Sequence, residues 1–171
     1  MRKVEVQPFN PLWVSKFQVE ADNLCAIFGE EIIDIHHIGS TSVPGLASRP
    51  IIDIMPVVLN INRIDEYNEK MANRGFESKG ENGIPGRRYF TKGGNNRSHH
   101  IHIYSSDNPQ IQRHLAFRDY LRTHPDVAKK YGDLKAELAE RFPYDISSYI
   151  KGKERLGFEI DKQATEWFRN I

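Results

Sequence analysis

The sequence lacks several features that define whole classes of proteins. It has a single cysteine, Cys25, which excludes an internal disulfide and is typical of a reducing compartment. No apolar run approaches the roughly 20 residues needed to span a bilayer. The N-terminal MRKVEVQPFNPLW has no apolar stretch of signal-peptide length. The sequence therefore predicts a cytoplasmic protein with no membrane partner.

The chain also lacks an excess of either charge. Its 24 Lys and Arg residues nearly balance 23 Asp and Glu residues, for a formal net charge of +1. A nucleic-acid binder normally carries a basic excess, so nucleic acid is not the expected partner. What is present is an ordinary globular composition, 39% hydrophobic and 27% charged over 171 residues. This length predicts one domain over residues 1–171, and nothing in the sequence indicates its oligomeric state.

Turn residues and hydrophobic periodicity predict a mixture of helices and strands. Capping residues and helix breakers place helices over 11–28, from Asn60 or Asn62 to 73, over 107–123 and 125–141, and from Asp145 to 167 or 168. Apolar runs predict strands over 31–38 and 51–59. A hairpin with arms 87–92 and 98–105 is predicted around a Gly-Gly-Asn-Asn turn. The result is one α/β (α+β) domain with a helical C-terminal third.

On the first helix, the apolar face is predicted to run from Leu12 through Trp13, Phe17 and Leu24 to Phe28. Cys25 lies between Leu24 and Ala26, so it is expected to be a small core residue and not a nucleophile.

One carboxylate, Asp53, interrupts the second predicted strand. A buried carboxylate costs several kcal/mol unless it is paired or does chemistry, so Asp53 needs a partner. The simplest alternative is that Asp53 caps a loop or pairs with Arg49. The preceding Gly39-Ser40 turn favours a functional role, because glycine lets the backbone approach a ligand closely. A serine beside free backbone N–H groups can hold phosphate.

Several separated segments resemble the GrpB family, a branch of the nucleotidyltransferase superfamily. They are HIGSTSVPGL at 37–46 with RPIIDI at 49–54, SHHIHIY at 98–104, and LAFRDYLRTHP at 115–125 with YGDLK at 131–135. The resemblance covers nearly the whole chain and implies a nucleotidyltransferase-like fold, a small mixed sheet flanked by helices. It implies that Gly39, Ser40, Thr41 and Arg49 bind a nucleotide or phosphorylated small molecule, with Asp53 as the catalytic carboxylate.

The sequence departs from the superfamily pattern at Met55. In that pattern two carboxylates lie one residue apart on the strand and hold two magnesium ions. A thioether is a poor ligand for a hard cation, so the standard site is incomplete and an enzymatic role is left open. One alternative is metal-dependent nucleotidyl transfer, with attack of a hydroxyl on the α-phosphate and loss of pyrophosphate. The other is a non-catalytic ligand-binding or accessory module. Related domains occur attached to dephospho-coenzyme A kinase, which suggests a link to coenzyme A metabolism.

Histidines offer a substitute set of metal ligands. Alternation places His100 and His102 on one face of the 98–105 strand, and both face Asp53 if that strand neighbours strand 51–59. Two imidazoles and one carboxylate suit zinc, manganese, iron or nickel better than magnesium. The sequence therefore suggests a divalent metal (Mg, Mn or Zn) at Asp53, His100 and His102. Hydrogen-bonded sheet histidines are the structural alternative, and a transition-metal hydrolase is a third functional one.

Arginines near the turn form a second group. Arg49 lies between the turn and Asp53 and matches the family pattern, and Arg88 lies on the first arm of the hairpin. If the hairpin flanks the turn, these guanidinium groups are expected to bind a phosphate or carboxylate held at the Gly39-Ser40 backbone. For Arg88 the alternative is a solvated surface charge.

Overall fold

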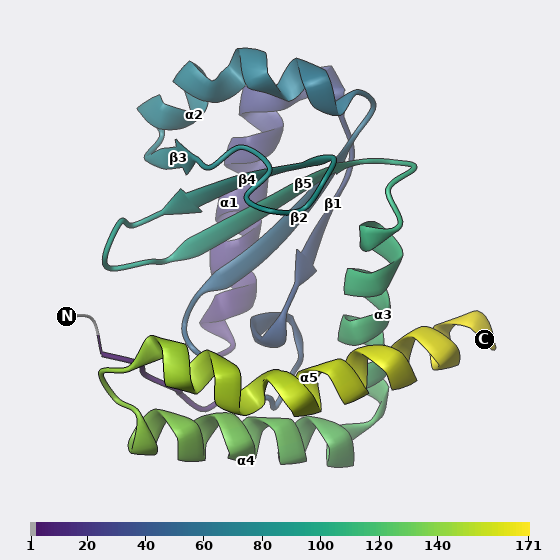
Figure 1. Cartoon of the computed structure of the whole chain (residues 1–171). Helices are drawn as coiled ribbons and strands as arrows, with labels where there is room; N and C mark the ends of the chain where they lie inside the picture. Colours follow the sequence, from purple (N-terminus) through teal and green to yellow (C-terminus); the bar gives the residue numbers. More distant parts are fainter. Residues whose placement is uncertain (1–2) are drawn as a thin grey trace. The chain divides into compact units, whose positions relative to one another are not determined.

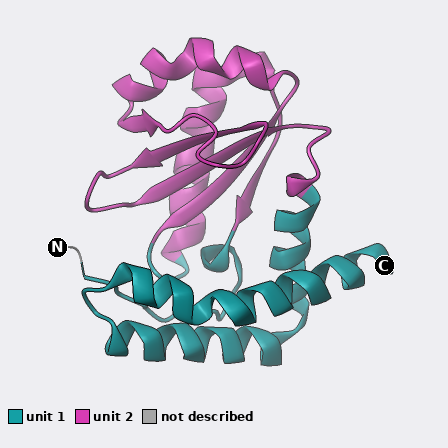
Figure 2. Cartoon of the chain, in the orientation of Figure 1, with its two compact units in different colours: residues 1–11, 39–50, 112–171 teal, residues 12–38, 51–111 magenta. Residues whose placement is uncertain are grey.

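The computed structural model describes residues 3–171, which group into two compact units (Figure 2). Unit 1 contains the described residues up to Pro11 together with Gly39–Pro50 and Gln112–Ile171. Unit 2 contains Leu12–Ile38 and Ile51–Ile111. Each unit is therefore built from segments that are far apart in the sequence.

Unit 2 contains the sheet. Its elements are α1 (Leu12–Phe28), β1 (Ile32–Ile38), β2 (Ile52–Val58), the 3-10 helix η3 (Ile61–Tyr67), α2 (Asn68–Asn73), β3 (Phe76–Ser78), β4 (Arg87–Lys92) and β5 (His99–Ser105). The five strands pair in the order β1-β2-β5-β4-β3 (Figure 1). Strands β2 and β5 are parallel, and the other pairs are antiparallel. The predicted mixed sheet and the β4–β5 hairpin are confirmed.

The two faces of the sheet differ in chemistry. On one face, α1 packs against β1 and β2, and the Phe17 ring stacks on His37 at 4.8 Å between ring centroids. On this side Ile52, Ile54 and Ile101 are almost completely buried. The register places Asp53 opposite His100 and Tyr89 opposite His102. Because side chains alternate along a strand, these four polar residues share the other face.

The buried face of α1 is narrower than the sequence predicted. Trp13, Leu24 and Phe28 are buried, but Leu12 is 60% exposed and Cys25 is also exposed. Cys25 follows Leu24 by one residue, a rotation of about 100° around the helix that takes its side chain off the buried stripe. The assignment of Cys25 to the core was therefore wrong.

Three elements also differ from the prediction. The segment after β2 begins as the 3-10 helix η3 and becomes α-helical only at Asn68. The strand β3 was not predicted. Helix α3 (Gln110–Thr123) starts later than expected, because the Asn108 side chain accepts the Gln110 backbone N–H at 2.9 Å, whereas Asp107 accepts the Ser105 hydroxyl.

Unit 1 contains the C-terminal helices. It holds the short 3-10 turn η2 (Ser40–Ser42), most of α3, α4 (Pro125–Arg141) and α5 (Ile146–Arg169). As predicted, the Asp145 carboxylate caps α5 by accepting the Ser148 N–H at 3.1 Å. Among residues 3–171, no helix has the length and apolar character needed to cross a bilayer. The helical C-terminal third is confirmed.

Helix α5 continues through Gly152 and Gly157. A Cβ at Gly152 would lie 2.6 Å from Leu138 Cδ2 of α4, a separation that real Cβ atoms do not show. A Cβ at Gly157 would approach only Tyr131 Oη, at 3.9 Å. Gly152 therefore allows α5 to pack closely on α4, at the cost of helix propensity.

Candidate functional site

The parallel pairing of β2 and β5 brings one carboxylate and two imidazoles together in unit 2. Asp53 Oδ1 lies 2.9 Å from His102 Nε2 and 3.5 Å from His100 Nδ1. The side chains of all three residues are partly buried, with 12–26% of their surface exposed. Strand alternation predicted this neighbourhood on the condition, implied by the family resemblance, that the two strands are neighbours, and the register of Asp53 with His100 produces it.

The hydrogen bonds assign a proton to each ring nitrogen that faces Asp53. Arg97 Nη1 lies 3.3 Å from His100 Nε2. A guanidinium has only donors, so His100 Nε2 must accept and His100 Nδ1 carries the proton directed at Asp53. A carboxylate only accepts, so His102 likewise donates through Nε2. Arg97 therefore donates to His100, and both imidazoles donate to the Asp53 carboxylate.

The carboxylate in this cluster is held ionised. Burial by itself would raise the pKa of Asp53, but hydrogen bonds from His100 and His102, together with the positive charge that these imidazoles carry when protonated, lower that pKa well below its usual range. The Tyr89 ring packs against both imidazoles, at 5.6 and 5.1 Å between ring centroids. Burial and the nearby Asp53 charge raise the pKa of Tyr89 to about 12, so its hydroxyl stays protonated.

The predicted metal does not fit these side chains as they are arranged. Both imidazoles direct N–H groups at Asp53, whereas a metal ligand must offer a lone pair. Within residues 3–171, no group of three or more His, Cys, Asp or Glu side chains is arranged to hold an ion. Met55, which stands at the second carboxylate position of the superfamily pattern, is fully buried. No step of the function proposed below is routed through a metal.

The glycine-serine turn lies in unit 1 and has a backbone that only glycine adopts readily. Gly39 has φ +73° and ψ −174°, and its carbonyl accepts the Ser42 N–H at 3.1 Å. Thr41 and Ser42 are buried, whereas Gly39 and Ser40 are half-buried. The turn is therefore a fixed structure with Ser40 at its accessible part.

A buried lysine supports this turn. Lys135 of α4 is 3% exposed, and its Nζ donates a hydrogen bond to Ser40 Oγ at 2.7 Å. The same ammonium lies 4.8 Å from the centroid of the Tyr131 ring. The ammonium places a buried positive charge beside the turn, and a positive charge favours an anion bound close to it.

Sequence reasoning did not identify Lys135 as a site residue. A lysine in a charged helix is usually solvated. The available signal was helical phase, since Ala128, Tyr131, Lys135 and Leu138 recur every three or four residues and all are buried.

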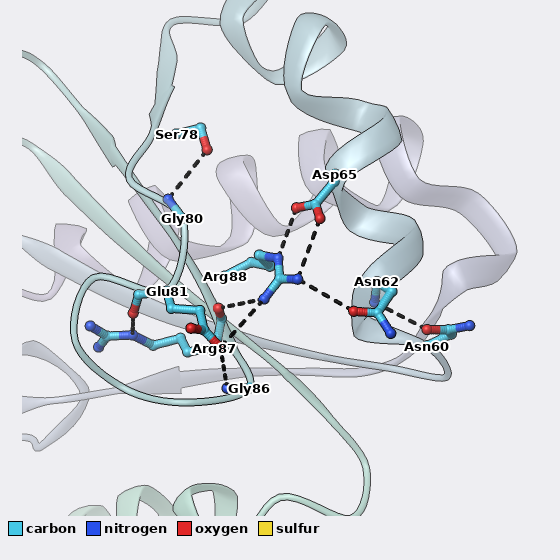
Figure 3. A network of polar contacts seen from close by, with 9 residues as sticks. All are labelled: Asn60, Asn62, Asp65, Ser78, Gly80, Glu81, Gly86, Arg87 and Arg88. Carbon is cyan, nitrogen blue, oxygen red and sulfur yellow. Dashed lines mark hydrogen bonds and ion pairs between the residues drawn. The ribbon is translucent and has the colours of Figure 1, made fainter.

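Arg88 is paired with side chains of unit 2. Its Nε donates to Asp65 Oδ1 at 2.8 Å, and its Nη2 lies 3.3 Å from Asp65 Oδ2 and 3.4 Å from Asn62 Oδ1 (Figure 3). Its ladder partner is Ile103, so Arg88 lies on the opposite face of the sheet from His102 and Asp53. These contacts favour a structural role, the joining of β4 to η3.

Arg49 lies in unit 1 beside α5. Its guanidinium carbon lies 5.8 Å from the centroid of the Tyr149 ring, and its carbonyl accepts the Ser48 hydroxyl at 2.8 Å. Tyr149 itself is buried. The phosphate-binding role that the resemblance implied for Arg49 stays a prediction.

These features define a mixed α/β protein with a polar sheet face in one unit and a lysine-backed glycine-serine turn in the other. The chain belongs to the GrpB family, because the family model described as GrpB protein matches residues 3–163. The crystal structure of conserved protein GrpB from Enterococcus faecalis superposes with a TM-score of 0.93 at 44% identity, covering 96% of this chain and 99% of that one.

Other known proteins share parts of this similarity. UPF0157 protein YqkA of Bacillus subtilis is 49% identical over 97% of this chain, but the match covers 48% of YqkA, so this chain spans about half of that relative. A dephospho-CoA kinase of Mycolicibacterium paratuberculosis is 24% identical over 96% of this chain and 46% of its own length. A Cid1 poly(U) polymerase structure is more distant, with a TM-score of 0.49 at 14% identity over 76% of this chain and 45% of its own.

Proposed function

We propose that this protein binds a nucleotide or a phosphorylated small molecule at the Gly39-Ser40 turn. The observation that carries the proposal is the buried Lys135 ammonium, whose Nζ lies 2.7 Å from the Ser40 hydroxyl. A phosphate oxygen at this turn would receive hydrogen bonds from the hydroxyl and from backbone N–H groups, and the ammonium would compensate its charge. Charge-assisted hydrogen bonds of this kind are about twice as strong as neutral ones.

A panel of nucleotides and sugar phosphates, screened by thermal shift, tests the proposal. A ligand that binds the folded protein raises the melting temperature, and the rise grows with the logarithm of the ligand concentration once this exceeds the dissociation constant. Ser40→Ala should reduce this shift, whereas Ser147→Ala, at an exposed position of α5, should preserve it. If no phosphorylated compound raises the melting temperature, the proposal fails. It also fails if both variants respond like the parent protein.

Nucleotidyl transfer is a candidate activity of this protein. Its support is Asp53, an ionised carboxylate at the position to which the family resemblance assigns the catalytic residue. Release of pyrophosphate from a nucleoside triphosphate, abolished in Asp53→Asn, is the expected result. Binding without pyrophosphate release would leave a ligand-binding module.

A non-catalytic accessory role is the second candidate. The observation that favours it is the match to dephospho-CoA kinase, since similarity over about half of that protein is what a shared module would produce. This role predicts a thermal shift with coenzyme A or dephospho-coenzyme A and no turnover. A shift with nucleoside triphosphates and none with either coenzyme A compound would exclude it.

A further inference from the structure

Unit 1 contains a cavity that the proposed phosphate site does not use. Its volume is about 390 Å³, at the small end of the range for small-molecule sites, which is roughly 300–1,000 Å³. It lies between the loop that follows η2, the end of α3 and the first half of α4. Its lining contains neither Ser40 nor Lys135.

The walls of the cavity are mostly apolar. Leu121 and Ala128 form a buried wall, and Pro44 and Ala47 lie on the more exposed side. Gly132 also lines the cavity, where a Cβ would lie 3.1 Å from Leu46 Cδ1. Gly132 therefore allows α4 to approach this loop closely, whereas the small side chains of Ala47 and Ala128 leave space that larger ones would fill.

One cation of the lining is available to a ligand. Arg122 donates its Nε to the Ser42 carbonyl at 3.0 Å, which fixes the guanidinium, and its Nη1 lies 3.9 Å from Asp119, at the limit of an ion pair. Within residues 3–171, Nη2 of Arg122 makes no hydrogen bond. The other cation, Lys129, is paired with Asp133 at 2.7 Å. The lining therefore carries a net charge of +1, on a guanidinium that is already positioned.

We propose that this cavity binds a small monocarboxylic acid with an apolar body. The carboxylate pairs with the Nη groups of Arg122, and the apolar body packs against Pro44, Ala47, Leu121 and Ala128. A monoanion matches the single available charge, whereas a phosphate dianion would leave one charge uncompensated. The site is additional to the phosphate site proposed at Ser40.

Titration of the full chain with benzoate, followed by backbone and arginine side-chain NMR, tests the proposal. Benzamide has nearly the same shape without the charge, and inorganic phosphate has the charge without the apolar body. Benzoate should bind saturably, with shifts at Arg122 and Gly132, and more tightly than either comparison compound. Arg122→Gln should weaken benzoate binding about tenfold, the effect of one charge-assisted hydrogen bond.

Two further variants keep the test decisive if Arg122→Gln fails to fold. Ala47→Leu fills the cavity and removes no polar contact, so it should also weaken benzoate binding. Arg155→Gln, at a 94% exposed side chain of α5, should leave binding unchanged. The proposal would be overturned by a lack of saturable benzoate binding, by equal binding of benzamide or phosphate, or by full affinity in Ala47→Leu.

Lys135→Met should retain benzoate affinity, and loss of that affinity would show that the two sites are not separate.

Discussion

Replacement of Asp53 by asparagine tests the hydrogen-bonded cluster on the sheet. Asparagine keeps the shape of the side chain but loses its charge, so its amide oxygen can still accept both imidazole N–H groups, but only as a neutral acceptor. The contact with His102 at 2.9 Å is a full charge-assisted hydrogen bond and that with His100 at 3.5 Å is a weak one. Together they predict a loss of about 2 kcal/mol in the free energy of unfolding, or about 4–8 °C in melting temperature.

The pH dependence of this loss follows from the lowered pKa of Asp53. A carboxylate whose pKa is lower in the folded than in the unfolded state stabilises the fold above its unfolded value of about 3.9. This stabilisation is lost as the pH falls through the folded pKa. The difference between parent and variant should therefore shrink below about pH 4.

Urea unfolding of the parent, Asp53→Asn and Asp34→Asn at several pH values measures these quantities. Asp34 is a matched control because it pairs with His36 at 3.3 Å on the same sheet but is 60% exposed. Its replacement should lower the free energy of unfolding by less than about 0.5 kcal/mol. Equal stabilities of Asp53→Asn and the parent, or a difference that does not change with pH, would refute the assigned role of Asp53.

Three further outcomes follow from the packing and the charges. Gly152→Ala should destabilise the protein by about 1–2 kcal/mol, because the new Cβ meets Leu138. Gly157→Ala should stabilise it by up to about 1 kcal/mol, because alanine has the higher helix propensity and the new Cβ has room. If thermal unfolding gives the reverse order, the packing argument is wrong. Lys92→Met should lower the free energy of unfolding, measured with urea, by about 3 kcal/mol, because it removes the cation that lies 2.9 Å from the buried Glu20 carboxylate. An unchanged free energy of unfolding would contradict this. Calorimetric titration of chelator-treated protein with zinc or manganese should show no saturable binding, and a stoichiometric site would show that the imidazoles rearrange for a metal.

Local patterns in the sequence predicted most elements of the fold. The arms of the 87–105 hairpin and the helix over 125–141 agree with the structure because their turn and capping residues are specific. The strand β3 was missed because three residues, Phe76–Ser78, are too few to show alternation. The strand order β1-β2-β5-β4-β3 depends on tertiary pairing, which no local pattern contains.

The candidate site was predictable to a similar extent. Alternation placed His100 and His102 on one face of their strand, and only the family resemblance implied that this strand neighbours β2, so that both would face Asp53. It did not anticipate that Arg97 and Asp53 would fix the protons on the imidazole rings, because that depends on side-chain positions. Lys135 was missed because its burial results from the packing of α4, although its spacing from Tyr131 carried a signal.

Isothermal titration of the tightest nucleotide found in the thermal-shift panel tests the central claim most directly. Lys135→Met keeps an unbranched side chain that is one atom shorter and removes its charge. Lys129→Met removes a charge from the same helix at a 76% exposed side chain. The account predicts at least a tenfold weaker affinity for Lys135→Met and an unchanged affinity for Lys129→Met. Equal affinities of Lys135→Met and the parent, with both proteins folded, would contradict it.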